Sequence, residues 1–232
     1  MRKYDVGIIG AMEPEIELLV ASLTSHKVDT VGTLTFHRGK IGKKKVVVVR
    51  SGVGKVFAAL TAEAMILKYA PRLIINTGVG GGLAAGLSVG DVLVADKLVQ
   101  HDMDTSPLGD PKGLISGINK IFFETDNRAA VMVCNIAEKL SLKCRRGTVA
   151  SGDVFVSTST LKESIRADFG ADACEMEGAA IAHVAYVNST PCCVIRAISD
   201  SADEESTVSY QEFLPVAAKN SASIVLELCR AY

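Results

Sequence analysis

Three carboxylates stand near the predicted ends of strands, where they could act on one ligand. Glu15 follows the β-rich run 4–10, Glu177 follows a short extended segment, and Asp200 comes near the end of the apolar run that starts at residue 192. In α/β sheets, ligands bind beyond the carboxyl ends of the strands, so these side chains can converge on one pocket. Carboxylates at such a place can serve as proton donors, bases or stabilising anions.

Glu175 and Glu177 are separated by one residue, a spacing that puts two side chains on the same side only in an extended segment. We therefore expect both acids at a strand end or in the turn that follows it, before Gly178 begins a helix over 178–187. Acidic residues also favour the positive end of a helix dipole. A solvated first turn is thus the alternative to a substrate site, and spacing alone leaves both open.

Strands and helices must alternate along the chain to position these acids. The pattern predicts strands over 4–10, two within 31–51, and others over 73–77, 91–99, 145–151 and from 192, with helices following residue 11 and over 56–69, 128–140, 159–166, 178–187 and 209–229. Neither a linker nor an internal repeat interrupts them. We predict a single α/β domain over 1–232, with a mixed central β-sheet flanked by helices.

Two glycine-rich segments follow predicted strands, at 51–55 and 78–82. Either turn could bring backbone N–H groups close to a ligand, although close packing in a tight turn is the alternative. The first segment lacks the full P-loop spacing, and no G-x-G-x-x-G fingerprint occurs, which argues against a nicotinamide-dependent dehydrogenase. The polar segment 101–120 is long enough to be a functional loop.

Composition excludes several classes of function. The net charge is −1 and the basic residues are scattered apart from a short run at 40–45, so neither nucleic acid nor a membrane surface is an expected partner. The hydrophobic content of 48% supports a large core, but no apolar run approaches the roughly 20 residues of a membrane span. Without a signal-peptide pattern, we expect a cytoplasmic protein.

Cysteine and histidine spacing predicts neither a disulfide framework nor a metal site. The six cysteines have no C-x-x-C spacing, and several lie in apolar runs, as small buried hydrophobic residues do. Among the four histidines, only the segment 101–104 resembles a ligand cluster, and a polar loop explains it better. We expect no metal and no organic cofactor.

The order of motifs along the chain closely resembles that of the 5′-methylthioadenosine/S-adenosylhomocysteine nucleosidases, whose fold is shared with the purine nucleoside phosphorylases. These motifs are Gly-Ala-Met-x-x-Glu at 10–15, Ser-Gly-x-Gly-Lys at 51–55, Asn-Thr-Gly-x-x-Gly-Gly at 76–82, Ser-Gly-Asp-x-Phe at 151–155, Glu-Met-Glu at 175–177 and Arg-Ala-Ile-Ser-Asp at 196–200. The resemblance covers nearly the whole chain. It implies hydrolysis of adenine nucleosides, a role in methionine salvage and a homodimer.

The resemblance also implies a role for each acid. Asp200 would protonate N7 of the adenine leaving group, Glu15 would activate the attacking water, and Glu177 would hold the ribose hydroxyls and stabilise positive charge at the anomeric carbon. An Asp in water has a pKa of about 3.9, too low for an acid at neutral pH. We therefore expect burial or neighbouring carboxylates to raise the pKa of Asp200.

The remaining site residues follow from the same resemblance. Phe155 would stack on the adenine, Met176 would lie against the sugar, Ser199 would orient Asp200, and Arg196 would support Glu175. The full set of predicted substrate-binding residues is Met12, Val53, Val79, Phe155, Val156, Glu175, Met176, Ser199 and Tyr210, with the main chain of Val156 reading the base edge and Met12 and Val53 lining the 5′-alkylthio side.

Departures from the family pattern leave alternatives. Apolar Val79, with no arginine in the 10–15 and 76–82 segments, favours water over phosphate as the nucleophile. Leu108 stands where an aromatic residue would cap the site of a neighbouring subunit. A phosphorylase or an aminodeoxyfutalosine nucleosidase of the same fold is the close alternative. A non-catalytic nucleoside-binding module is an alternative of another class, although the full set of acids argues against it.

Overall fold

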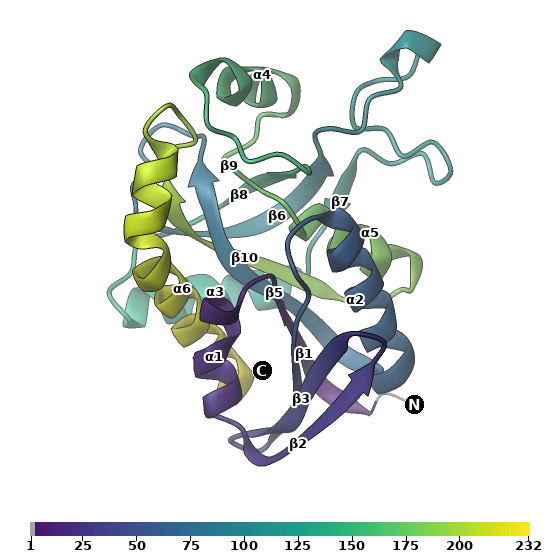
Figure 1. Cartoon of the computed structure of the whole chain (residues 1–232), viewed down its shortest axis with the longest axis vertical. Helices are drawn as coiled ribbons and strands as arrows, with labels where there is room; N and C mark the ends of the chain where they lie inside the picture. Colours follow the sequence, from purple (N-terminus) through teal and green to yellow (C-terminus); the bar gives the residue numbers. More distant parts are fainter. Residues whose placement is uncertain (1–2) are drawn as a thin grey trace.

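A ten-stranded mixed sheet runs through the centre of the protein, whose computed structural model describes residues 3–232 (Figure 1). The strands are β1 Tyr4–Gly10, β2 Thr24–Val31, β3 Leu34–Ile41, β4 Lys44–Arg50, β5 Pro71–Gly82, β6 Val92–Gln100, β7 Phe122–Glu124, β8 Cys144–Ser151, β9 Ala173–Glu175 and β10 Cys192–Asp200. Their order in the sheet is β10-β6-β8-β9-β5-β1-β4-β3-β2, with β7 paired to β6. The predicted α/β fold with a mixed sheet is confirmed.

Five strands close into a ring at one end of the sheet. β10 pairs parallel with β5 and antiparallel with β6, and β9 joins β8 to β5. β6 and β8 are parallel and complete the ring. The ends of β5, β8, β9 and β10 consequently lie close together, although they come from distant parts of the chain.

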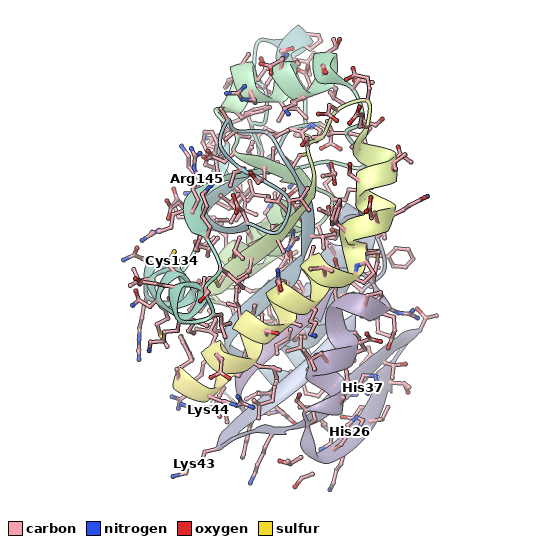
Figure 2. The ribbon with its side chains drawn as sticks, turned by 90° about the vertical axis from the view of Figure 1, so that its left-hand side faces the viewer. His26, His37, Lys43, Lys44, Cys134 and Arg145 are labelled. Carbon is pink, nitrogen blue, oxygen red and sulfur yellow. The ribbon has the colours of Figure 1, made fainter. Side chains whose placement is uncertain are left out.

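Helices cover both faces of the sheet. They are α1 Glu13–Ala21, α2 Lys55–Tyr69, α3 Asn127–Lys139, α4 Ser159–Phe169, α5 Gly178–Val187 and α6 Ser206–Ala231, with a short 3₁₀ helix at Ser106–Leu108. One apolar core lies beneath α1, α3 and α6, and another beneath α2 and α5. Figure 2 shows α6 beside α1 on the face of the sheet that these two helices cover, and the label Cys134 marks α3. All six helices were predicted; where both ends were given they lie within three residues of the observed ends, and those of α5 coincide with them.

The sequence predicted a turn at the glycine segment 78–82, and this prediction is wrong. The segment continues β5. Pairing with β10 on one side and β9 on the other holds it extended. A side chain on Gly78 would come within 2.5 Å of the Glu15 carboxylate, and one on Gly81 within 2.9 Å of the Asp200 carboxylate. The glycines therefore let the strand pass close to two acids of the site.

Two strands were not predicted, β2 and the short β7 at Phe122–Glu124. β2 was not predicted because its residues are polar and mostly exposed, so no alternation marks it as a strand. The expected loop at 101–120 is present and carries the 3₁₀ helix Ser106–Leu108, and Figure 1 shows this segment projecting from the body of the protein. Leu108 at its tip is 84% exposed.

Candidate active site

A pocket opens where the ends of β5, β9 and β10 meet the start of α1. It encloses about 540 Å³ of space free of protein atoms, part of it open to solvent, which is the size of a small-molecule site. All twelve predicted site residues line it: Met12, Glu15, Val53, Val79, Phe155, Val156, Glu175, Met176, Glu177, Ser199, Asp200 and Tyr210. The structure thus places every predicted residue at one site, while their roles remain predictions.

Glu15 lies in the first turn of α1 and is buried. One carboxylate oxygen, Oε2, accepts hydrogen bonds from the backbone N–H groups of Ala11 (2.7 Å) and Met12 (2.9 Å), and Oε1 accepts one from Val79 (3.2 Å). Burial raises the pKa of Glu15, although the positive charge of Arg196 and these hydrogen bonds oppose the rise. The three backbone hydrogen bonds orient the carboxylate, and the raised pKa increases its affinity for a proton. A base acting on water requires both.

Asp200 ends β10 and is only 2% exposed. Ser199 Oγ donates to its Oδ2 at 2.8 Å, so the predicted contact between these residues is confirmed. The backbone N–H of Ala202 donates to Oδ1 at 2.9 Å. Burial raises the pKa of Asp200 above its ordinary value, which is the direction that a proton donor needs.

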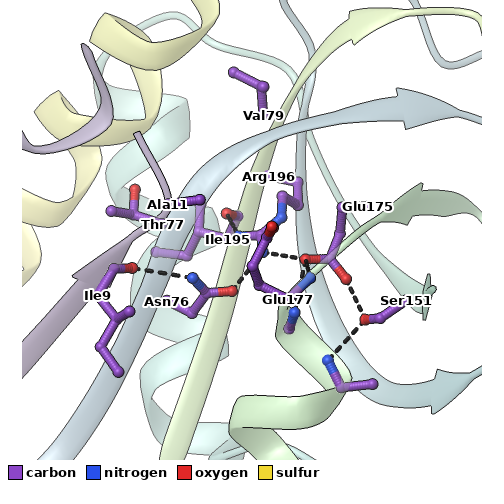
Figure 3. Close-up of polar contacts among 12 residues, drawn as sticks. Ile9, Ala11, Asn76, Thr77, Val79, Ser151, Glu175, Glu177, Ile195 and Arg196 are labelled. Atoms are coloured by element: carbon purple, nitrogen blue, oxygen red, sulfur yellow. Dashed lines mark hydrogen bonds and ion pairs between the residues drawn. The ribbon is translucent and has the colours of Figure 1, made fainter. Parts of the chain in front are cut away.

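Glu175 is the buried centre of a polar network (Figure 3). Its carboxylate pairs with Arg196, as predicted, and accepts hydrogen bonds from Ser151 Oγ and from the backbone N–H of Gly178 at 2.7 Å. Arg196 also donates to Asn76 Oδ1. Burial alone would raise the pKa of Glu175, but the charge of Arg196 and these hydrogen bonds lower it, so Glu175 stays an anion.

Glu177 stands two residues further on, at the N-terminus of α5. Its Oε1 accepts a hydrogen bond from the backbone N–H of Gly54 at 2.8 Å, and its own N–H donates to Glu175 at 3.0 Å. Burial and then the negative charge of Glu175 raise the pKa of Glu177 to about 7. The two acids of this segment therefore differ: Glu175 is a fixed anion, and Glu177 exchanges a proton near neutral pH.

The glycine turn 51–55 binds protein carboxylates. Besides the bond from Gly54 to Glu177, the N–H of Lys55 donates to Asp153 Oδ1 at 2.7 Å. The Lys55 ammonium pairs with Asp102 at 2.6 Å. Because acids of the same chain take these donors, close packing explains the turn better than a phosphate site does.

Both the sequence and the fold of the chain match known proteins. The family model described as the phosphorylase superfamily matches residues 5–230. The chain belongs to the phosphorylase superfamily. Its resemblance to the 5′-methylthioadenosine/S-adenosylhomocysteine nucleosidases is also confirmed, because it is 40% identical to the enzyme of that name from Haemophilus influenzae strain PittEE over 224 residues, covering 96% of this chain and 97% of the relative.

Other members of the superfamily are similarly close. The chain is 38% identical over 224 residues to the aminodeoxyfutalosine nucleosidase of Campylobacter jejuni, with 97% of each chain covered. A variant nucleosidase from Helicobacter pylori with 5′-methylthioadenosine in its active site superposes with a TM-score of 0.95 at 36% identity over 99% of both chains. The Neisseria meningitidis nucleosidase in complex with methylthio-immucillin-A also gives 0.95, at 37% identity, covering 99% of this chain and 100% of that one.

In this member of the superfamily, the rim of the pocket is apolar. Tyr210 from α6 meets Phe155 edge-on, with ring centroids 5.5 Å apart, and its hydroxyl lies 3.2 Å from the sulfur of Met12. Val53 and Phe155 are 49% and 41% exposed. Aromatic and aliphatic surface of this kind suits a flat base and an alkylthio group.

Sequence reasoning missed five residues of the pocket lining: Ala11, Gly80, Gly81, Val154 and Cys174. They are small or apolar, and residue type alone gives no sign of a site role. Their position next to Met12, Val79, Phe155 and Glu175 in the chain is the one signal that could have found them.

Residues 3–232 contain no group of three or more His, Cys, Asp or Glu side chains arranged to hold a metal ion. In the histidine-containing segment 101–104, Asp102 bonds to Lys55 and to the backbone N–H of Asp153. Across the same described residues, the helices are too short or too polar for a membrane span.

Proposed function

We propose that the protein hydrolyses the N-glycosidic bond of 5′-methylthioadenosine and S-adenosylhomocysteine, giving adenine and 5-methylthioribose or S-ribosylhomocysteine. The observation that carries this proposal is the set of three carboxylates, Glu15, Glu177 and Asp200, around one pocket with an aromatic rim. Two relatives named 5′-methylthioadenosine/S-adenosylhomocysteine nucleosidase, each 40% identical over nearly the full length, support the choice of substrates.

The reaction places opposite charges at the two ends of the breaking bond. Asp200, with its raised pKa, donates a proton to N7 of the purine as negative charge develops on the leaving group. Glu177 binds the ribose hydroxyls and faces the positive charge that grows at the anomeric carbon. Glu15 orients a water molecule and takes its proton as the new C–O bond forms.

Water is the nucleophile in this proposal because the pocket offers little to a phosphate ion. Among the residues described in the structure, those lining the pocket include neither Arg nor Lys. The nearby guanidinium of Arg196 is already bound to Glu175 and Asn76. Val79 adds an apolar surface where a phosphate would need a donor.

An assay of adenine release tests both the reaction and the nucleophile. The purified protein should release adenine from 5′-methylthioadenosine and S-adenosylhomocysteine equally well with and without phosphate. Strict dependence on phosphate would make the protein a phosphorylase. Binding of both compounds without any adenine release would make it a non-catalytic nucleoside-binding module.

Aminodeoxyfutalosine is a second candidate substrate, favoured by the 38% identity to the Campylobacter jejuni enzyme. It shares the adenine and ribose that the carboxylates would bind and differs on the 5′ side. Including it as a competitor in the same assay ranks the three compounds by kcat/KM.

A homodimer fits the surface of the protein. Val56, Leu60 and Leu67 lie along one side of α2 and are exposed, as is Leu108 in the projecting loop. Exposed apolar side chains grouped on one helix are typical of a subunit interface. Light scattering after gel filtration should give twice the chain mass. We also propose a cytoplasmic location and a role in methionine salvage.

A further inference from the structure

A second groove adjoins the pocket on the side of Met12 and Val53. Both residues, together with Ala11, line the pocket and the groove alike. Arg50 at the end of β4 and Glu13 at the start of α1 bring opposite charges to the groove. A ligand that fills the pocket can therefore extend past an apolar neck onto a pair of charged side chains.

The charged pair is available to a ligand. The closest approach between Arg50 Nη1 and Glu13 Oε2 is 3.7 Å, and the two side chains are 58% and 61% exposed. Among residues 3–232, this is the one ion pair that either side chain makes. A single long contact leaves most of the guanidinium donors and a carboxylate oxygen free, and such exposed pairs add little to stability.

Backbone hydrogen bonds hold this pair in place relative to the acids of the site. Ser51 donates its N–H to the carbonyl of Gly10 at 2.9 Å, and Gly52 donates to Ala11 at 3.1 Å. These bonds join the turn after β4 to the turn after β1, and Glu15 stands two residues beyond Glu13 in α1. The fold therefore fixes where the backbones of Arg50 and Glu13 lie relative to Glu15.

We propose that Arg50 and Glu13 form a subsite for a zwitterionic amino-acid tail on the 5′ sulfur of the substrate. The tail carboxylate would bind Arg50, and its ammonium group would bind Glu13. This inference rests on the proposed function, in which Met12 and Val53 face the 5′-alkylthio group.

The chemistry of the candidate substrates matches this division. In S-adenosylhomocysteine, the ammonium and carboxylate are both attached to the third carbon beyond the sulfur, so they present adjacent opposite charges. The methylthio group of 5′-methylthioadenosine ends at the apolar neck and reaches neither charge. Loss of the pair should thus affect one substrate and spare the other.

Steady-state kinetics of both substrates test the proposal on Arg50→Gln and Glu13→Gln proteins. Each substitution should raise KM for S-adenosylhomocysteine about threefold to tenfold, in line with partly exposed ion pairs, and change KM for 5′-methylthioadenosine less than twofold. Higher ionic strength should raise the wild-type KM for S-adenosylhomocysteine more than that for 5′-methylthioadenosine. For each variant, the KM for 5′-methylthioadenosine is an internal control, because both substrates bind the same carboxylates.

Two exposed residues outside the groove provide matched control variants. Glu17 lies on the exposed side of α1, and Lys43 precedes β4 at the far end from Arg50, where Figure 2 shows it at the edge of the protein. Glu17→Gln and Lys43→Gln should leave both KM values unchanged. Equal changes for the two substrates in Arg50→Gln, or no change for either, would overturn the subsite.

Failure of the proposed function would give a different result. Wild-type protein would then release adenine from neither compound. Calorimetric affinities of the two compounds for wild-type and Arg50→Gln protein would decide the subsite in that case. A selective loss of S-adenosylhomocysteine affinity supports it, and an equal or absent loss refutes it.

Discussion

The floor and the rim of the pocket are built on different principles. The floor holds four carboxylates at strand ends and helix starts, and each of these residues is at most 8% exposed: Glu15, Glu175, Glu177 and Asp200. On the rim, Val53, Val154 and Phe155 are 39% to 49% exposed. Hydrogen bonds from backbone N–H groups hold the floor acids, and burial shifts their pKa values. The rim offers apolar area but no charge. The proposed function assigns the chemistry to the floor and the binding of the base to the rim.

Asp200→Asn should have the largest effect, because the floor loses the proposed proton donor while the shape of the side chain is kept. We expect kcat to fall by about 10³-fold or more, as for loss of a general acid, with an unchanged circular dichroism spectrum and Tm. Adenine release measured by absorbance gives the rate. Asp168→Asn is the control, since Asp168 lies on the exposed side of α4, pairs with Lys112 and does not line the pocket. Substantial turnover by the folded Asp200→Asn protein would remove Asp200 from the acid role.

Arg196→Met tests how far the floor depends on its buried ion pair. The substitution leaves the Glu175 carboxylate buried without its counter-charge, so the free energy of unfolding should fall by about 3–5 kcal/mol. Urea denaturation measures the change. Arg166→Met, which breaks the exposed pair with Glu163, should cost less than about 1 kcal/mol.

The double variant Arg196→Met/Glu175→Gln sharpens this test. Neutralising Glu175 removes the unpaired charge, so part of the lost stability should return. If the double variant were as unstable as the sum of the two single variants, packing rather than charge would explain the effect.

Glu177→Gln tests the pH dependence of the floor. The pKa of Glu177 rises from 4.5 to about 7 in the folded protein, so the folded state binds the proton more tightly than the unfolded state does. The unfavourable contribution of this group is therefore absent below pH 4.5, grows as pH rises, and is complete above pH 7. Relative to wild type, Glu177→Gln should gain about 1–3 kcal/mol of unfolding free energy at pH 8 and little at pH 4.

Urea denaturation of both proteins at the two pH values gives this difference directly. Glu163→Gln, at an exposed position on α4, should show no pH-dependent gain. A gain for Glu177→Gln of equal size at both pH values would mean that Glu177 does not titrate in this range.

Phe155→Ala should have the smallest effect and should spare stability, because the side chain lies on the exposed rim. Loss of stacking on adenine should raise KM about tenfold, while kcat stays within a few-fold of wild type. Phe155→Tyr, which keeps an aromatic ring, should restore KM. A loss of kcat as severe as that of Asp200→Asn would end the distinction between rim and floor.

The sequence allowed much of the site to be predicted because its residues follow strands. Glu15, Glu177 and Asp200 each follow or end an extended segment, and parallel strands bring such positions to one edge. The order of motifs then identified the family. Strand β2 was missed because exposed polar residues carry no alternation, and the run 78–82 was taken for a turn because glycine is more common in turns than in strands.

Residue types and their order along the chain determined the fold class, the family and most of the residues at the site, because these depend on local pattern. Tertiary structure alone decided how two acids in one short segment differ. Glu175 pairs with Arg196 from β10 and stays charged, whereas burial and the neighbouring charge of Glu175 raise the pKa of Glu177 to about 7, although the backbone N–H of Gly54 donates to it. Arg196 and Gly54 come from distant parts of the chain, and the strand pairing that brings them to this segment cannot be deduced from the spacing of the acids.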